Sequence, residues 1–290
     1  MLIVDLAFLF ALCASFSYAL CDMAIRSGLQ HTNAFIGSTI VLASTLFILI
    51  GFVVFSQPSF PSLGIHYLWI IFAGACNPGL FFIFYLTGIS KIGVARAAPI
   101  KGSSPILGTL LGILILSEEP TWKNLVGIAF VFSGITLITF EKTDGGYKKI
   151  QILWPIAAAI VSSFAAVFWR KGLQSFPDTT VGTTIGTIIG LSIVGIYTIL
   201  TTKSFSEVNI KKSFRPFLLA GLLMACGFFC YTKAMKLGEV YRMLPIIQTS
   251  PIFTVTMAFF LVRKFEKLTW KIPTGCLMTV GGALLVNLKW

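Results

Sequence analysis

Ten apolar runs, each about 20 residues long, follow one another along this chain and are separated by short polar connections. A helix of that length covers about 30 Å, the thickness of the hydrocarbon core of a bilayer. Lipid offers the backbone no hydrogen-bond partners, and a helix satisfies its backbone groups within each run. The pattern therefore predicts an all-α membrane protein with ten transmembrane helices. The expected spans are residues 4–26, 34–55, 67–89, 93–116, 123–140, 152–171, 179–200, 214–236, 240–262 and 270–288.

The composition also indicates a membrane protein. Of the 290 residues, 56% are hydrophobic and 11% are charged, and the mean hydropathy is +0.91; soluble domains carry about 25% charged residues. A net charge of +12 would suggest nucleic acid for a soluble protein, but here Lys and Arg fall mainly between the apolar runs, where they meet lipid headgroups. We therefore expect the lipid bilayer as a partner and no nucleic acid. The first run follows no basic leader and no small-residue cleavage site, so it predicts a span and not a removable signal.

The cysteines and histidines give no sign of a metal or cofactor. All six cysteines fall within the expected spans, and neither histidine has acids or cysteines at metal-ligand spacing. No glycine-rich phosphate loop ends in Lys-Ser or Lys-Thr, which excludes an ATP-driven pump made of this chain alone. We expect no catalytic residues, no cofactor and no metal site.

The second half of the sequence repeats the first. RAAPIKGSSPI at residues 96–106 matches RMLPIIQTSPI at residues 242–252, with Arg, Pro, Ile, Ser, Pro and Ile at the same places. FFIFYLTGISKIG at residues 81–93 matches GFFCYTKAMKLGE at residues 227–239. Matches at so many fixed offsets indicate a duplication.

Further matches extend this repeat over the whole chain. Gly127 aligns with Gly275 and Gly134 with Gly282, and RSGLQ near the start of the first half aligns with RKGLQ in the second. Five spans in each half is an odd number, so the second half enters the membrane from the opposite side, as in many secondary transporters. We expect five-helix repeats at residues 1–141 and 150–290, joined by a loop at residues 142–149.

The repeated undecapeptide carries two prolines in each copy, and each proline tends to kink its helix. The freed carbonyl groups need partners inside the protein or in a cavity. Small and polar residues at 102–104 and 248–250 can supply them. Spans four and nine are thus expected to form a central pair that lines the pathway; the alternative is a pair of kinked helices that only pack.

These motifs resemble the EamA-like family of the drug/metabolite transporter superfamily. The resemblance rests on an aromatic patch at Tyr85, an Ala/Pro-rich fourth helix at residues 95–116, the Glu118-x-x-Thr121 motif, and a fifth helix that ends in Gly134-Ile-Thr-Leu, with echoes in the second half. The resemblance implies ten helices around a central cavity, bordered by spans one, three, four, six, eight and nine. We read Glu118 and Thr121 as structural, with Thr121 as the N-cap of the next helix.

Lys101 is the clearest charged residue at membrane depth, where ionisable groups are costly and mark functional sites. It lies between the two prolines of span four, and Ile247 occupies its place in the second repeat. The residue can bind a carboxylate or phosphate of a substrate. Alternatively it snorkels or neutralises Asp22.

Asp22 is the acidic counterpart in span one. Ser15, Tyr18, Asp22 and Arg26 follow at helical spacing and give this span one polar face. Asp22 can bind an amino group or a coupling proton; the alternative is an ion pair with Arg26 at i+4. The second repeat has no acid at this place.

The remaining candidates are polar or aromatic residues within the expected central spans. Asn77 precedes Pro78 in span three, and an amide there is suited to a cavity wall. The complete set of candidate substrate-binding residues is Lys101, Asp22, Asn77, Tyr18, Ser104, Tyr85, Trp169, Tyr231 and Gln248.

The sequence thus predicts a secondary transporter that moves a small polar organic metabolite by alternating access, with amino acids or related carboxylates favoured. Phosphorylated-metabolite or nucleotide exchange and export of lipophilic cations or drugs are the alternatives. A membrane-embedded enzyme acting on lipid-linked substrates would need convergent acids, histidines or a metal, and a non-transporting scaffold is the third class. We expect a monomer in a bacterial inner membrane. The Lys and Arg count places the N-terminus outside, whereas the resemblance implies an N-terminus inside, which we follow.

Overall fold

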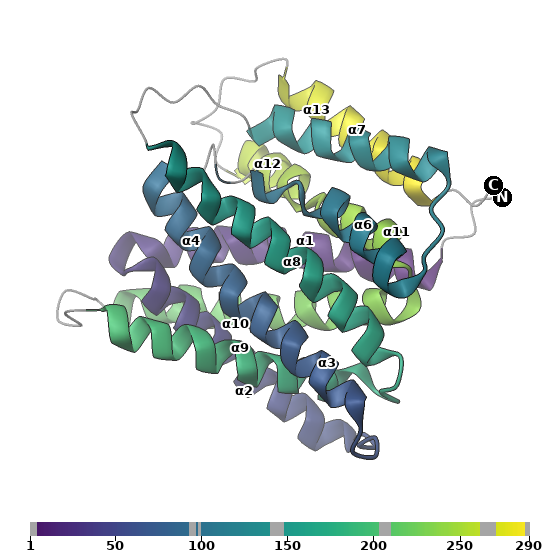
Figure 1. Ribbon diagram of the computed structural model, residues 1–290. Coiled ribbons are helices and arrows are strands. Elements are labelled where there is room, and N and C mark those ends of the chain that lie inside the picture. The colour runs from purple at the N-terminus through teal and green to yellow at the C-terminus, as the bar shows by residue number, and fades with distance from the viewer. Residues whose placement is uncertain are drawn as a thin grey trace.

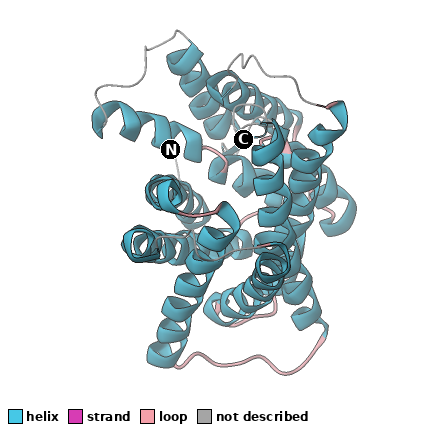
Figure 2. Cartoon of the chain, turned by 90° about the vertical axis from the view of Figure 1, so that its left-hand side faces the viewer, coloured by secondary structure: helices cyan, strands magenta, loops and turns pink. Residues whose placement is uncertain are grey.

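The computed structural model describes residues 5–92, 97, 100–139, 148–202, 210–261 and 271–287 (Figure 1). All regular structure in these ranges is helical, and short loops join the helices (Figure 2). The main helices are α1 (Leu6–Gly28), α2 (Ala34–Ser56), α3 (Ile65–Gly74), α4 (Phe81–Ile92), α6 (Ser104–Leu116), α7 (Trp122–Thr139), α8 (Leu153–Leu173), α9 (Thr179–Thr201), α10 (Ile210–Leu237), α11 (Val240–Ile247), α12 (Ser250–Leu261) and α13 (Lys271–Asn287). Short helical turns are η1 (Leu29–His31), η2 (Ala75–Leu80) and η3 (Lys149–Ile152).

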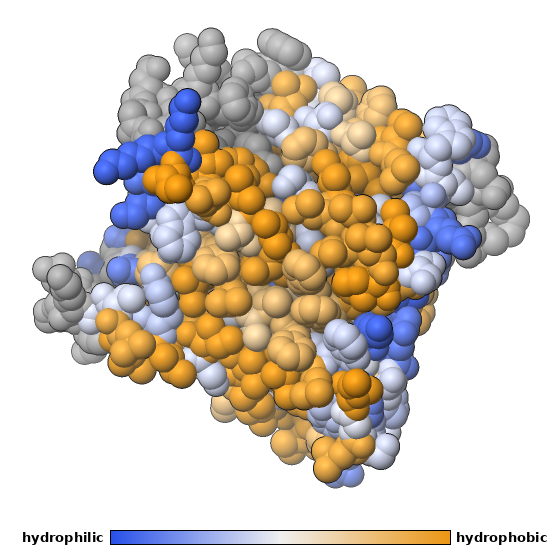
Figure 3. All heavy atoms as spheres, viewed as in Figure 1, coloured by the Kyte–Doolittle hydropathy of each residue, from blue (hydrophilic) through white to orange (hydrophobic). Residues whose placement is uncertain are grey.

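These helices confirm the predicted all-α membrane fold. Six helical segments in the described chain are long and apolar enough to cross a membrane, and shorter apolar helices cover Ser104–Leu116, Trp122–Leu137 and Thr274–Val286. Apolar side chains cover the middle of the face in Figure 3, and hydrophilic side chains lie along both lateral edges. An apolar belt between two polar rims is the surface that a bilayer requires.

Polar side chains fix where several helices begin. Asp5 accepts a hydrogen bond from the N–H of Ala7 at the start of α1, and Asn33 accepts one from Phe35 at the start of α2. Such N-caps satisfy backbone donors that have no partner within the helix.

Asp178 caps α9 in the same way, through the N–H and hydroxyl of Thr180. Burial alone would raise the pKa of Asp178. The hydrogen bonds from Thr180, together with Lys233 and Lys236, outweigh this effect and lower it. Asp178 therefore stays ionised and keeps its cap and its ion pair with Lys233, 3.9 Å away.

The repeated undecapeptide breaks both of its helices at the same place. The chain turns at residues 102–103, between the helical residues before them and α6, and at residues 248–249, between α11 and α12. In each copy the N–H of the turn residue, Ser103 or Thr249, donates to a carbonyl three residues back at 3.1 Å. Its hydroxyl donates to the same carbonyl, that of Ile100 or Ile246, at 2.7 Å. The predicted kinks are thus true breaks whose carbonyls are satisfied within the turn; Pro99 lies outside the described residues.

The expected third span, residues 67–89, is not one continuous helix. Asn77 departs from helical geometry (φ −146°, ψ 115°) within the π-helical turn η2, which joins α3 to α4. Pro78 follows directly, and a residue before proline disfavours the α conformation. The matching part of α10 runs without such a departure among its described residues. This break therefore occurs in the first repeat only.

Helices α7 and α13, the fifth spans of the two repeats, lie side by side (Figure 1). A Cβ atom on Gly134 would lie 2.6 Å from the carbonyl oxygen of Gly275, and one on Gly127 would lie 2.8 Å from that of Gly282. Gly127 aligns with Gly275 and Gly134 with Gly282. When each glycine is replaced by its aligned partner, the Gly134–Gly275 contact therefore becomes the Gly282–Gly127 contact. That reciprocity is the pattern of two inverted repeats packed about a two-fold axis.

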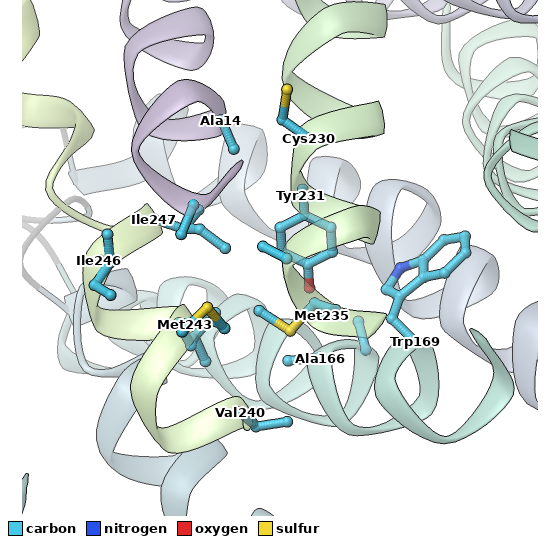
Figure 4. Packing of buried hydrophobic residues seen from close by; sticks show 14 of the residues in the cluster. Ala14, Ala166, Trp169, Cys230, Tyr231, Met235, Val240, Met243, Ile246 and Ile247 are labelled. Carbon is cyan, nitrogen blue, oxygen red and sulfur yellow. The ribbon is translucent and has the colours of Figure 1, made fainter. Parts of the chain in front are cut away.

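A hydrophobic core lies where α8, α10 and α11 meet. Figure 4 shows Tyr231 and Met235 of α10 between Trp169 of α8 and Met243 of α11. Small residues such as Ala166 let the helices approach closely, as is usual in membrane bundles. This packing fixes Tyr231 at the centre of the protein.

Two adjacent glycines of α13 allow a matched test of the α7–α13 contact. We expect Gly282→Leu to lower the melting temperature by several degrees, because a Cβ there would lie 2.6 Å from the carbonyl oxygen of Gly127, and overpacking costs about 1–3 kcal/mol. Gly281→Leu is the control, since nothing lies within 4 Å of its Cβ position. Equal melting temperatures for the two variants would contradict the close approach of these helices.

Candidate functional site

A cavity of about 440 Å³ lies between α1, α4, α10 and the two helix breaks. Its volume falls in the range of pockets that hold small molecules, roughly 300–1,000 Å³. The predicted residues that line it are Tyr18, Asp22, Asn77, Tyr85, Lys101, Tyr231 and Gln248. The structure thus brings most of the sequence-predicted candidates to one place, and their binding to a substrate stays a prediction.

Ser104 and Trp169 do not line this cavity. Both side chains are fully buried behind its wall. Ser104 accepts a hydrogen bond from the side chain of Gln248, and the indole N–H of Trp169 donates to the backbone carbonyl of Asn77 at 3.4 Å. They support residues of the wall and are not placed to touch a ligand.

Lys101 projects into the cavity from the first helix break. Its Nζ donates to Oε1 of Gln248 at 2.9 Å. The same atom lies 5.6 Å from the ring centre of Phe81 and 5.9 Å from that of Tyr85. These two rings stack on each other with centroids 5.5 Å apart. A cation over aromatic faces is stabilised by their quadrupoles, so the ammonium is held without an acid in direct contact.

Gln248 is the centre of a short hydrogen-bond chain. Its Oε1 accepts from Lys101, and its Nε2 donates to Oγ of Ser104 at 2.6 Å. The backbone carbonyl of Ser104 accepts in turn from the hydroxyl of Ser163 on α8 at 2.9 Å. The chain joins the break of the second repeat to that of the first.

Asp22 lies on α1, and its side chain is exposed to the cavity. None of the ion pairs among the described residues includes Asp22, so the alternative pairing with Arg26 does not occur in this structure. The positive charge of Lys101 attracts its carboxylate from across the cavity without direct contact. Its carboxylate therefore lines the cavity without an ion-pair partner among the described residues.

Several wall residues were not among the predicted candidates. Phe81, Phe82 and Phe228 line the cavity, as does Arg26. Phe81 lies four residues before Tyr85, so helical spacing alone places both on one face. With Phe as 27 of 290 residues, however, composition does not separate a wall phenylalanine from a packing one.

The cavity lining reaches one end of the bundle. It includes Arg26 and Leu29 at the end of α1, Ala34 at the start of α2 and Ile89 near the end of α4. At the opposite end, ion pairs connect the start of α11 to the start of α1. The guanidinium nitrogens of Arg242 lie 3.7 Å from a carboxylate oxygen of Asp5 and 3.5 Å from one of Glu239. Among the described residues the cavity thus opens towards the end of α1. We call this the open end, and we call the end at the start of α1, where these ion pairs lie, the closed end.

Glu118 makes a second contact at the closed end, and its partners lie in the other repeat. Thr121 does cap α7, together with Asn124. Glu118, by contrast, accepts hydrogen bonds from the N–H groups of Val240 and Tyr241, at the start of α11 in the other repeat. Burial raises the pKa of Glu118, and these two donors act against that rise. No local pattern reveals a contact between residues 122 positions apart.

Comparisons with known proteins identify the family. The profile of the EamA-like transporter family matches the chain twice, over residues 5–140 and 149–288. The uncharacterized transporter YyaM of Bacillus subtilis (strain 168) is 23% identical over 157 residues, which cover 52% of this chain and half of that protein. Protein LicB of Haemophilus influenzae is 25% identical over 210 residues, 68% of this chain and 69% of that protein.

A solved structure supports the fold. One chain, described only as the crystal structure of a protein, covers 97% of this chain with a TM-score of 0.80 and 16% sequence identity, a likeness that shows the fold alone. The family and the relatives named as transporters favour a transporter over an enzyme. The chain belongs to the EamA-like transporter family and is a multi-pass integral membrane transporter.

Proposed function

We propose that this transporter moves amino acids, held as zwitterions between Asp22 and Lys101. The observation that carries the proposal is the presence of both charges, of opposite sign, in one cavity. Neither Asp22 nor Lys101 takes part in an ion pair among the described residues. A ligand with one ammonium and one carboxylate group matches this arrangement.

The proposed binding chemistry follows from the contacts that the side chains of the cavity wall make. Lys101 has three donor hydrogens, and its hydrogen bond to Gln248 uses one of them. A substrate carboxylate can accept from the others, and charge-assisted hydrogen bonds of this kind are stronger than neutral ones. A substrate ammonium can donate to Asp22. The aromatic wall around Phe81, Tyr85 and Phe228 then suits an apolar substrate side chain.

The pseudosymmetry supports alternating access. Arg26 and Arg170 occupy matching places in the two repeats. Arg170 donates to the carbonyls of Met235 and Lys236 at the closed end, whereas Arg26 is exposed at the open end. In one conformation of an alternating-access cycle, equivalent residues of the two repeats are expected to differ in this way, one bonded and the other exposed. The two repeats, residues 1–141 and 150–290, would exchange these states.

One alternative has an observation in its favour. Asp22 with Tyr18, Phe81, Tyr85 and nearby rings forms an acidic, aromatic-rich wall, which also suits lipophilic cations. Lys101 disfavours such cations because it places a positive charge in the same cavity. Ligands without a carboxylate therefore discriminate between the two functions.

Two further expectations belong to this proposal. Asp22 is the candidate carrier of a coupling proton, because it is the one acidic residue among the described residues of the cavity wall. The named relatives are bacterial, which supports a place in a bacterial inner membrane.

Lys101→Met tests the carboxylate site. A panel of amino acids, their decarboxylated amines, organic phosphates and lipophilic cations is screened for a rise in the melting temperature, since a ligand of the folded state stabilises it. We expect amino acids to stabilise the parent, and Lys101→Met to weaken their binding about tenfold or more, the effect of losing one charge-assisted bond. Lys91→Met, at the exposed end of α4, is the control. Stabilisation by phosphates or cations alone would overturn the proposed substrate class.

Asp22→Asn tests the ammonium site with an almost isosteric change. We expect this variant to lose amino-acid binding by about tenfold or more but to keep its affinity for the corresponding deaminated carboxylic acids, which never used Asp22. Glu119→Gln, an exposed acid between α6 and α7, controls for the loss of one charge. Equal affinity of parent and Asp22→Asn for amino acids, measured by titration calorimetry, would show that Asp22 does not bind the ammonium group.

A further inference from the structure

Helix α11 belongs to the second repeat but is held at both ends by side chains of the first. It has eight residues, Val240–Ile247, and every one of them is buried. At its start Oε1 of Glu118 accepts from the N–H of Val240 at 2.8 Å, and Oε2 accepts from that of Tyr241 at 3.3 Å. At its end Gln248 is bonded to Lys101 and Ser104.

The contact at the start of α11 is a favourable one for a carboxylate. The first N–H groups of a helix have no partner within the helix, so Val240 and Tyr241 depend on Glu118. The helix dipole also favours a negative charge at this point. Glu118 is only 9% exposed, so water does not readily replace it. Arg170, which binds the end of α10, adds a positive charge that attracts Glu118.

The contact at the end of α11 leads directly into the cavity. Gln248 is 7% exposed and uses both ends of its amide, one towards Lys101 and one towards Ser104. Anything that draws Lys101 away leaves the amide oxygen of Gln248 without this partner. A buried acceptor without a partner is unfavourable, which favours a movement of Gln248 to a position where its amide oxygen finds another donor.

We propose that α11 is a lever that couples the cavity to the closed end of the transporter, with Glu118 as its releasable latch. A ligand that binds the other donor hydrogens of Lys101 and draws its ammonium group towards itself breaks the bond to Gln248, and the end of α11 is freed. Because packed helices move as rigid units, the shift carries to the start of α11 and loosens Val240 and Tyr241 from Glu118. Glu118 is then a positioning residue of the transport cycle and touches no substrate. Only the ligand step rests on the proposed role of Lys101.

The test follows amide exchange at the latch in the ligand-free full-length protein. Hydrogen–deuterium exchange is read by mass spectrometry over residues 238–243, with α9 as an internal reference for global stability. Glu118→Gln calibrates the signal, and we expect faster exchange by about tenfold or more, the effect of weakening bonds to a charged group. Glu119→Gln should leave the rate unchanged.

The decisive variants lie at the other end of the lever. Gln248→Leu and Lys101→Met both cut the bond between the cavity and α11, and each should raise exchange at Val240 and Tyr241 while α9 is unchanged. Ser103→Ala alters the first helix break without touching Gln248, and it should leave the latch as in the parent. Parent-like exchange at the latch in both Gln248→Leu and Lys101→Met would overturn the lever and leave Glu118 as a plain cap. Since no ligand is present, this result is independent of whether amino acids bind.

Discussion

A helix that breaks inside a bilayer frees backbone groups that lipid cannot satisfy, and the rest of this structure depends on how that constraint is met. Both repeats meet it with the same turn, in which a hydroxyl residue, Ser103 or Thr249, returns two hydrogen bonds to one carbonyl. Gln248 then ties the second break to the first. The breaks are thereby stable at the centre of the protein, where side chains from both repeats can face one cavity.

The proposed function rests on features in which the two repeats differ. The duplicated parts build the frame: paired breaks, and α7 packed on α13 through reciprocal glycine contacts. Lys101 and Asp22 have no charged counterpart in the second repeat, and the Asn77 break is likewise confined to the first. A symmetric cavity would bind both ends of a ligand alike. The added charges give it a positive and a negative side, and we propose that a zwitterionic substrate is recognised by this difference.

Patterns that depend on local chemistry could be predicted from the sequence, and contacts between distant segments could not. Hydropathy predicted the spans, and the repeated prolines predicted the breaks, because both act within one helix. Ser104 and Trp169 were expected in the cavity wall, yet each turns to a buried partner that only the folded chain supplies. Glu118 was expected to be structural, but its partners lie in the opposite repeat and no local pattern identifies them. Helical spacing alone was also too weak to single out Phe81.

An experimental structure of the protein with an amino acid bound tests most directly whether Lys101 and Asp22 form a zwitterion site. We expect the ligand carboxylate within hydrogen-bond distance of Nζ of Lys101 and the ligand ammonium within hydrogen-bond distance of the Asp22 carboxylate. A ligand whose carboxylate lies away from Lys101, or whose ammonium makes no contact with Asp22, would contradict the reading of this cavity as a zwitterion site.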